Sequence, residues 1–348
     1  MNGYNFGFNP FDSNAHAEFE QHRQLERSGL KKNASRLGIL LVIYVVLSNY
    51  IMPYLFMAIY HIAYAHSFSG RYSVVRDYFA ENYSSFLGML LNICCVVPSL
   101  LVVLLVVKPA LRIELSGLFH YEKGSMKIAL IAFPAAFLGN IAAGQLTNIF
   151  SNIMQESGVT VPEANFAIDT PELRTFLIQI FYVVILGPVV EEVLYRGIAL
   201  RLLKPYGKGM AVVVSSAVFA LMHGNIPQAV NAFLFGLLMG TIAVQFNSIL
   251  PTILIHILNN AFSSVTDVAD ALNSQLLYNI YGIVFLLVML LGGLVVFVYY
   301  KKIRLPKNET RFLSTGEKYV LAFFNFFMLA YWAILAYEYV RMFLIYNQ

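Results

Sequence analysis

Charged residues and cysteines are scarce in this sequence. Only 12% of the 348 residues are charged and 59% are hydrophobic, and the mean hydropathy is +0.67. Soluble globular chains carry about 25% charged residues, so the composition excludes that class and predicts an integral membrane protein. The two cysteines, Cys94 and Cys95, are adjacent within an apolar run, which excludes a disulfide framework or a zinc ribbon.

Motifs for nucleic acids and nucleotides are also missing. The sequence has no internal repeat, no Gly-rich phosphate loop and no DNA-binding motif. Its net charge of +4 follows from basic residues beside apolar runs, so we expect no nucleic-acid partner. We also expect no cleaved signal peptide, because the polar segment before the first apolar run is too long.

Long apolar runs recur along the chain and predict transmembrane helices, each able to cross a hydrocarbon core of ~30 Å. None shows the alternation of a barrel strand, so the predicted fold class is an all-α polytopic transmembrane bundle of about eight to nine spans. The runs lie roughly at 37–60, 86–107, 127–150, 173–203, 209–223, 228–246, 249–266, 277–300 and 319–340.

Basic residues indicate how these spans are oriented. With a cytoplasmic N-terminus, most lysines and arginines fall in cytoplasmic loops, as the positive-inside rule requires. We therefore expect a multi-pass cell-membrane protein, of bacterial type, in contact with membrane lipid. The basic residues expected on the other side are Arg71, Arg76, Arg174 and Arg341.

Few ionisable residues lie deep in the predicted spans. Of the 19 acidic residues only Glu191 and Glu192 do so, with Glu338 near the end of the last span, and of seven histidines only His223 and His256 do. A charge near the membrane centre costs at least ~2.5 kcal/mol, so such groups tend to face a bundle interior or a wet cavity. We expect them to form one site.

Helical spacing suggests how this site is arranged. Glu192 and Arg196 are four residues apart and can form an ion pair, which leaves Glu191 pointing ~100° away to face another partner. Gly187 and Pro188 should kink the helix one turn earlier.

A turn at Gly207 relates Glu191 to His223. Each is 16 residues from Gly207, ~24 Å along an ideal helix, so an antiparallel pair of helices brings them to one level. His256 and Asn260 share a helix face by their four-residue spacing.

Purely structural interpretations compete with this one. Glu192 with Arg196 can be a helix-locking pair, His223 a helix cap and Asn260 an interhelical contact. Gly236 and Gly240 favour a close helix-packing face. These interpretations leave Glu191 without a local partner.

Three motifs in order resemble the CPBP, or Abi, intramembrane proteases, which include type II CAAX prenyl proteases and bacteriocin-processing proteins. They are EEVLYR from Glu191, FALMH from Phe219 to His223, and HILNN from His256. The resemblance covers roughly residues 125–265. It implies that Glu191 and His223 activate water, that His256 and Asn260 stabilise the oxyanion, and that Glu192 and Arg196 support the site.

This resemblance divides the chain into four parts. They are a polar, mostly disordered cytoplasmic tail (1–36), N-terminal transmembrane helices (37–124), a CPBP-like core (125–266) and C-terminal transmembrane helices (267–348). The expected substrate is a membrane-tethered peptide or protein, with CAAX-type and leader-type processing both open.

The chemistry leaves two mechanisms and one rival function open. Glu191, His223 and His256 match the ligand set of a catalytic zinc ion, but the sequence lacks HExxH, and we favour metal-free catalysis. The rival is a proton-coupled transporter that uses the same residues as a relay, and a non-catalytic membrane protein is a further alternative.

Overall fold

The described part of the chain is built from helices alone. In the computed structural model it comprises residues 13–64, 86–111, 117–162, 173–299, 304–307 and 312–347. It contains no strand, and seven of its helices are long and apolar enough to cross a membrane, which confirms the predicted all-α bundle. These candidate spans are His16–Ile62, Phe86–Val106, Ser125–Glu156, Leu173–Tyr206, Ile226–Phe246, Gln275–Tyr299 and Phe326–Tyr346.

Two of the nine predicted spans are shorter than expected. The runs at 209–223 and 249–266 form α9 (Lys208–Leu221) and α11 (Leu250–Ser263), which have 14 residues each. At 1.5 Å per residue each is ~21 Å long, less than a hydrocarbon core of ~30 Å.

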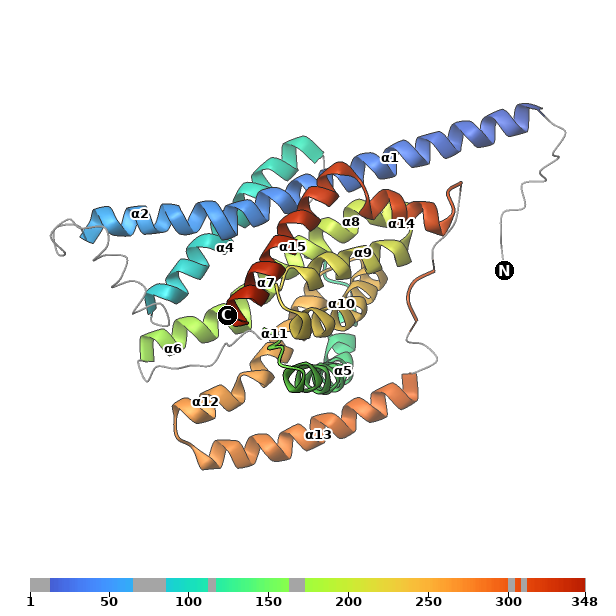
Figure 1. Ribbon diagram of the computed structural model, residues 1–348. Coiled ribbons are helices and arrows are strands. Elements are labelled where there is room, and N and C mark those ends of the chain that lie inside the picture. The colour runs from blue at the N-terminus through green and yellow to red at the C-terminus, as the bar shows by residue number, and fades with distance from the viewer. Residues whose placement is uncertain are drawn as a thin grey trace.

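The N-terminal region is more ordered than predicted. The helices α1 (Ser13–Val46), η1 (Leu47–Ile51) and α2 (Met52–Tyr64) form one continuous rod along the bundle (Figure 1). The expectation of a mostly disordered tail is thus wrong for residues 13–36, and residues 1–12 lie outside the described part. The reason is burial, because Leu30 and Ala34 are fully buried in the core.

An ionic contact holds this rod against α14 (Thr315–Phe323). The buried ammonium of Lys318 lies 2.9 Å from Glu26, and the guanidinium of Arg23 lies 2.7 Å from Glu317. Glu317 completes a capping box with Ser314, and the backbone N–H of Ser314 together with Arg23 lowers the pKa of Glu317 to about 2. Sequence reasoning treated these charges only as loop and tail residues.

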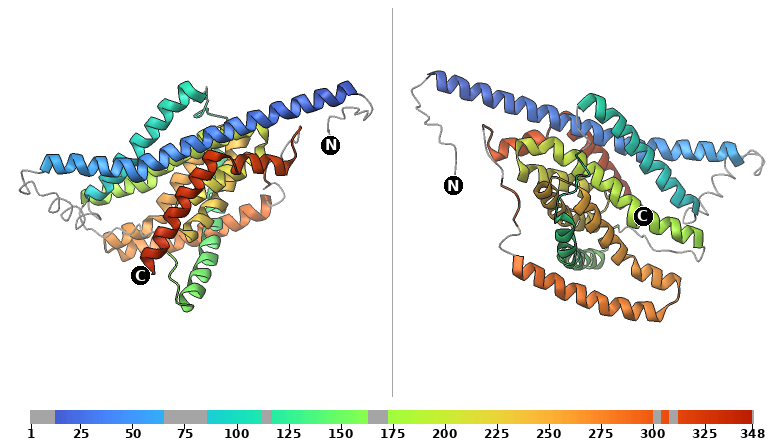
Figure 2. Two further views of the ribbon diagram at one scale, coloured as in Figure 1. Left: turned by 45° about the horizontal axis from the view of Figure 1, so that its top comes forward. Right: turned by 180° about the vertical axis from the view of Figure 1, so that it is seen from behind.

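The helix α5 (Ser125–Glu156) lies at the centre of one half of the bundle. It packs against α10 (Ile226–Phe246), α11 and α13 (Gln275–Tyr299). Figure 1 views α5 nearly end-on, with α13 on one side of the bundle and the α1–α2 rod on the other, and both views of Figure 2 keep that arrangement. The helices α4 (Phe86–Leu111) and α12 (Val265–Ala271) complete these two sides.

The helices α9 and α10 pack closely against each other as an antiparallel pair. A Cβ atom added to Gly236 would lie 3.0 Å from the Cβ of Ser216, and one added to Gly240 would lie 3.1 Å from a methyl group of Val212. These distances confirm the predicted close-packing face.

The helix α15 (Phe326–Tyr346) braces the α9–α10 connection. Tyr331 Oη donates to the carbonyl of Val218 at 3.4 Å, and Tyr339 Oη donates to that of Asn225 at the same distance. Glu338 lies elsewhere on α15, where it pairs with Arg341 at 2.8 Å and accepts from Tyr50. The third deep acidic residue therefore belongs to a different contact from Glu191 and Glu192.

Candidate active site

The helix that carries Glu191 enters the π-helical register twice. It runs through α6 (Leu173–Ile180), the π-helix η2 (Phe181–Leu186), α7 (Gly187–Glu191) and the π-helix η3 (Glu192–Ala199), and then α8 (Leu200–Leu203) and the 3₁₀ turn η4 (Lys204–Tyr206). Such π-helical turns are rare and are often found at functional sites.

Pro188 gives the first π-helical turn a physical cause. The N–H of Gly187 donates to the carbonyl of Tyr182, five residues earlier, and in that register the carbonyl of Val183 faces position 188. Proline has no N–H, so this carbonyl needs another donor. In a regular α-helix the proline would leave the carbonyl of Val184 without a donor, and the π register moves this free carbonyl to Val183.

The predicted ion pair between Glu192 and Arg196 is present. Arg196 Nη1 lies 3.0 Å from Glu192 Oε1, and both side chains are completely buried. The guanidinium also lies 4.3 Å from the ring centroid of Phe219, in a cation–π contact. Phe219 thereby joins the ion pair to α9, as expected of a supporting residue.

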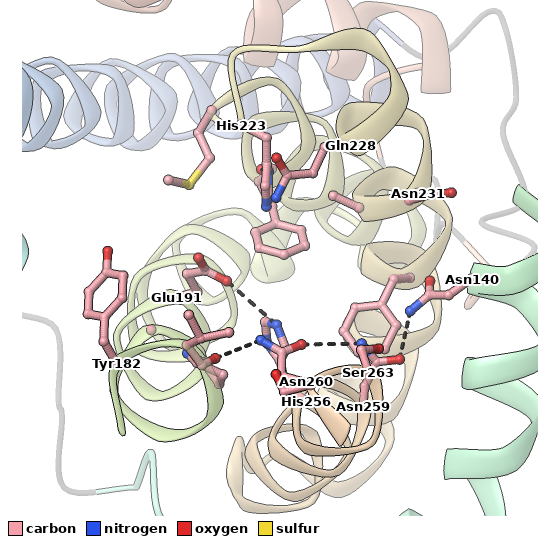
Figure 3. Close-up of a pocket in the computed structure, with 18 of the residues that line it drawn as sticks. Asn140, Tyr182, Glu191, His223, Gln228, Asn231, His256, Asn259, Asn260 and Ser263 are labelled. Carbon is pink, nitrogen blue, oxygen red and sulfur yellow. Dashed lines mark hydrogen bonds and ion pairs between the residues drawn. The ribbon is translucent and has the colours of Figure 1, made fainter. Parts of the chain in front are cut away.

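His256 lies between the two adjacent carboxylates. Its Nδ1 lies 3.1 Å from Glu192 Oε1. Its Nε2 lies 3.6 Å from Glu191 Oε2 (Figure 3). Sequence spacing gave Glu191 no partner but His223, whereas the structure gives it His256 as well. The Glu191 side chain is 24% exposed while that of Glu192 is fully buried, so Glu191 is the carboxylate that reaches the cavity.

His223 follows the end of α9 and is held by backbone carbonyls. Its Nδ1 lies 2.9 Å from the carbonyl oxygen of Phe219 and 3.2 Å from that of Ala220. A carbonyl only accepts, so Nδ1 carries the proton and Nε2 is left as an acceptor. As the spacing from Gly207 predicted, Glu191 and His223 line the same cavity.

Asn260 supplies the donor that Val183 requires. Its Nδ2 donates to that carbonyl at 2.9 Å, and its Oδ1 accepts from Asn259 Nδ2 at 3.2 Å. Asn259 Oδ1 in turn accepts from Asn140 Nδ2 of α5 at 2.8 Å (Figure 3). Sequence reasoning missed Asn140 and Asn259, because Asn260 was identified by its four-residue spacing from His256 and by the HILNN motif, and neither signal marks these two residues.

These side chains surround one cavity of about 470 Å³. That volume lies within the range of small-molecule binding sites, about 300–1,000 Å³. Carboxamides dominate its polar lining, and Glu191 and Asp267 are its acidic residues. The polar and histidine lining residues are Asn140, Gln179, Gln228, Asn231, Asn259, Asn260, Ser263, Ser264, His223 and His256.

The positions of the three predicted zinc ligands decide whether a zinc ion fits this cavity. Glu191, His223 and His256 all line the cavity, but no three His, Cys, Asp or Glu side chains in the described ranges are grouped so as to hold a metal ion. The side chains as they lie therefore do not fit a zinc ion with three protein ligands.

One comparison with known proteins gives a match. Residues 173–262 match the family model described as "Type II CAAX prenyl endopeptidase Rce1-like". No curated protein and no solved structure matches the chain. The matched segment contains Glu191, Glu192, Arg196, His223, His256 and Asn260. It begins after α5, so α5 and Asn140 lie outside it.

Proposed function

We propose that the chain is an intramembrane endopeptidase that cleaves membrane-tethered peptides, on the premise that residues 173–262 match the Rce1-like type II CAAX prenyl endopeptidase family model, which is consistent with the CPBP family. In the proposed mechanism, Glu191 and His223 activate the water molecule that attacks the peptide bond. One observation supports the proposed function most strongly. Glu191 of α7, His223 after α9, and His256 and Asn260 of α11 converge on one cavity.

Water activation is assigned to the two groups with free acceptors. Glu191 is a partly exposed carboxylate, and His223 has its Nε2 available because backbone carbonyls occupy Nδ1. The two groups orient a water between them, and Glu191 takes its proton as the oxygen attacks the carbonyl carbon of the substrate. Glu191 then returns the proton to the leaving amine when the C–N bond breaks, so the products are a carboxylic acid and an amine.

Oxyanion stabilisation is assigned to His256 and Asn260. His256 lies between the carboxylates of Glu191 and Glu192, and Arg196 pairs with Glu192, so the imidazole is held where it can donate an N–H to charge that develops in the cavity. When Glu191 accepts the proton from water, its negative charge moves to the oxyanion. His256 remains beside that charge, and Asn260 offers the second N–H of its amide.

We further propose that the N-terminus is cytoplasmic. Asn33 of α1 donates to the carbonyl of Leu202 at 3.1 Å, and Lys204 donates to Asn247 at 2.7 Å. These contacts bring the basic segments around residues 23–36 and 201–208 to one end of the bundle, as a cytoplasmic face requires. Arg71, Arg76, Lys301, Lys302 and Arg311, which also entered the prediction, lie outside the described residues.

Cleavage by the purified protein tests the function. The probe is a quenched-fluorescence peptide with a farnesylated CAAX terminus, compared with an acyl-anchored leader-type peptide and with the same sequences without lipid. We expect mass spectrometry to show one internal cut in a lipid-anchored peptide. Proton-driven uptake into proteoliposomes without any cleavage would instead establish the transporter.

A further inference from the structure

We propose that Asn140 is a positioning residue that orients the amide of Asn260 through Asn259. This inference rests on the proposed function, in which Asn260 binds the oxyanion. Asn140 lies on α5, outside the segment that matches the protease family. The three side chains form a continuous series of hydrogen bonds of 2.8, 3.2 and 2.9 Å that ends at the carbonyl of Val183.

The direction of this series is set by its last acceptor. The carbonyl of Val183 can only accept, so Asn260 must turn its Nδ2 toward it and its Oδ1 toward Asn259. Asn259 must then donate through Nδ2, which turns its own Oδ1 toward Asn140. Asn140 is therefore required as a donor, and each carboxamide has one orientation that satisfies its neighbours.

This orientation decides where the remaining N–H of Asn260 points. One Nδ2 proton is used by Val183, and the other is left for the cavity. An oxyanion donor is effective only when it is aligned in advance with the position where charge develops. Loss of Asn140 leaves Asn259 Oδ1 without this donor, so Asn259 can rotate, and Asn260 then keeps only its hydrogen bond to Val183 and can turn about it.

A purely structural role makes a different prediction. Hydrogen bonds between carboxamides also hold helices together in membranes. An interhelical contact of that kind changes thermal stability and leaves turnover of the folded enzyme unchanged. A positioning residue lowers kcat at nearly constant KM, and its effect depends on the presence of Asn260.

The test compares kcat, KM and Tm of the full-length protein with four variants, using the farnesylated peptide. The variants are Asn140→Ala, Asn260→Ala, the double variant, and Asn148→Ala, whose side chain is exposed on the same helix. We expect Asn140→Ala to lower kcat about 10-fold. This is the lower end of the losses measured when a residue that orients a metal ligand by a hydrogen bond is replaced. Asn148→Ala should match the wild type.

The double variant decides the mechanism. If Asn140 acts through Asn260, adding Asn140→Ala to Asn260→Ala lowers kcat no further. An unchanged kcat in Asn140→Ala, or a full additional loss in the double variant, overturns the inference. If Asn140→Ala does not fold, Asn140→Ser and Asn259→Ala are measured in the same way. Failure of the proposed function is distinguishable from failure of this inference. If the protein is not an endopeptidase, the wild type does not cleave the peptide either, whereas a failed inference leaves cleavage by the wild type intact.

Discussion

One carboxylate oxygen of Glu192 contacts both Arg196 and His256. Oε1 lies 3.0 Å from Arg196 Nη1 and 3.1 Å from His256 Nδ1, and all three side chains are buried. The carboxylate that pairs with Arg196 therefore also holds the imidazole of His256 in the cavity. Structural and catalytic contributions of Glu192 are coupled through this atom.

Removal of Glu192 or Arg196 should lower stability to a similar extent and activity to different extents. Each alanine variant leaves a buried charge without its ion-pair partner, at a cost of about 3–5 kcal/mol. Glu192→Ala also releases His256, so its remaining folded fraction should turn over more slowly than that of Arg196→Ala. Thermal unfolding and kcat per folded molecule measure the two effects.

Glu156→Ala is the matched control, because Glu156 is exposed at the end of α5. Its Tm should equal that of the wild type. Unchanged stability with lost activity in both Glu192→Ala and Arg196→Ala would contradict the supporting role and move both residues into the catalytic set.

Pro188→Ala should reduce turnover without reducing stability. The new N–H at position 188 can donate to the carbonyl of Val183 and compete with Asn260. We expect a several-fold lower kcat and an equal or higher Tm. Pro251→Ala is the control, since a proline in the first turn of α11 replaces no helical hydrogen bond. A wild-type kcat in Pro188→Ala would show that Asn260 does not depend on the missing donor.

Local spacing predicted the parts of the site that lie on one helix or one hairpin. The Glu192–Arg196 pair follows from the four-residue repeat, and the shared level of Glu191 and His223 follows from counting outward from Gly207. The contacts of His256 depend on how α11 is rotated against α7. That rotation is a tertiary property, and no sequence spacing encodes it.

Two further features escaped the sequence for physical reasons. The π-helical register was missed because spacing arguments assume 3.6 residues per turn throughout. The helix at 13–36 was missed because its polar sequence suggested disorder, whereas Leu30 and Ala34 are buried and α1 packs against α14, far later in the chain. Long-range contacts of this kind override local composition.

Glu26→Ala should strongly destabilise the contact between α1 and α14. Lys318 is completely buried with its ammonium 2.9 Å from Glu26 Oε1, and Glu26 Oε2 accepts from the backbone N–H of Phe312 at 2.9 Å. Removing one partner of a buried pair costs about 3–5 kcal/mol, which thermal unfolding can measure. Glu18→Ala, at an exposed site on the same helix, should leave Tm unchanged. Equal Tm values for both variants would refute the proposed role of this contact.

Activity should survive removal of metal ions. In the proposed mechanism His223 assists Glu191 on a water and His256 donates to the oxyanion, so strong chelators should leave kcat unchanged. His223→Ala and His256→Ala should lose activity with no change in metal content. The measurement is metal analysis of purified protein before and after chelation. One zinc ion per active enzyme, lost together with activity in either variant, would show that the two histidines are ligands.

The central claim is that Glu191 activates the water that cleaves the peptide bond. Its most direct test is the initial rate of hydrolysis of the farnesylated peptide by Glu191→Gln, which keeps the size of the side chain and removes its basicity. The account predicts a loss on the order of 10²–10⁴-fold, at the Tm of the wild type. Hydrolysis at a rate near that of the wild type would contradict it.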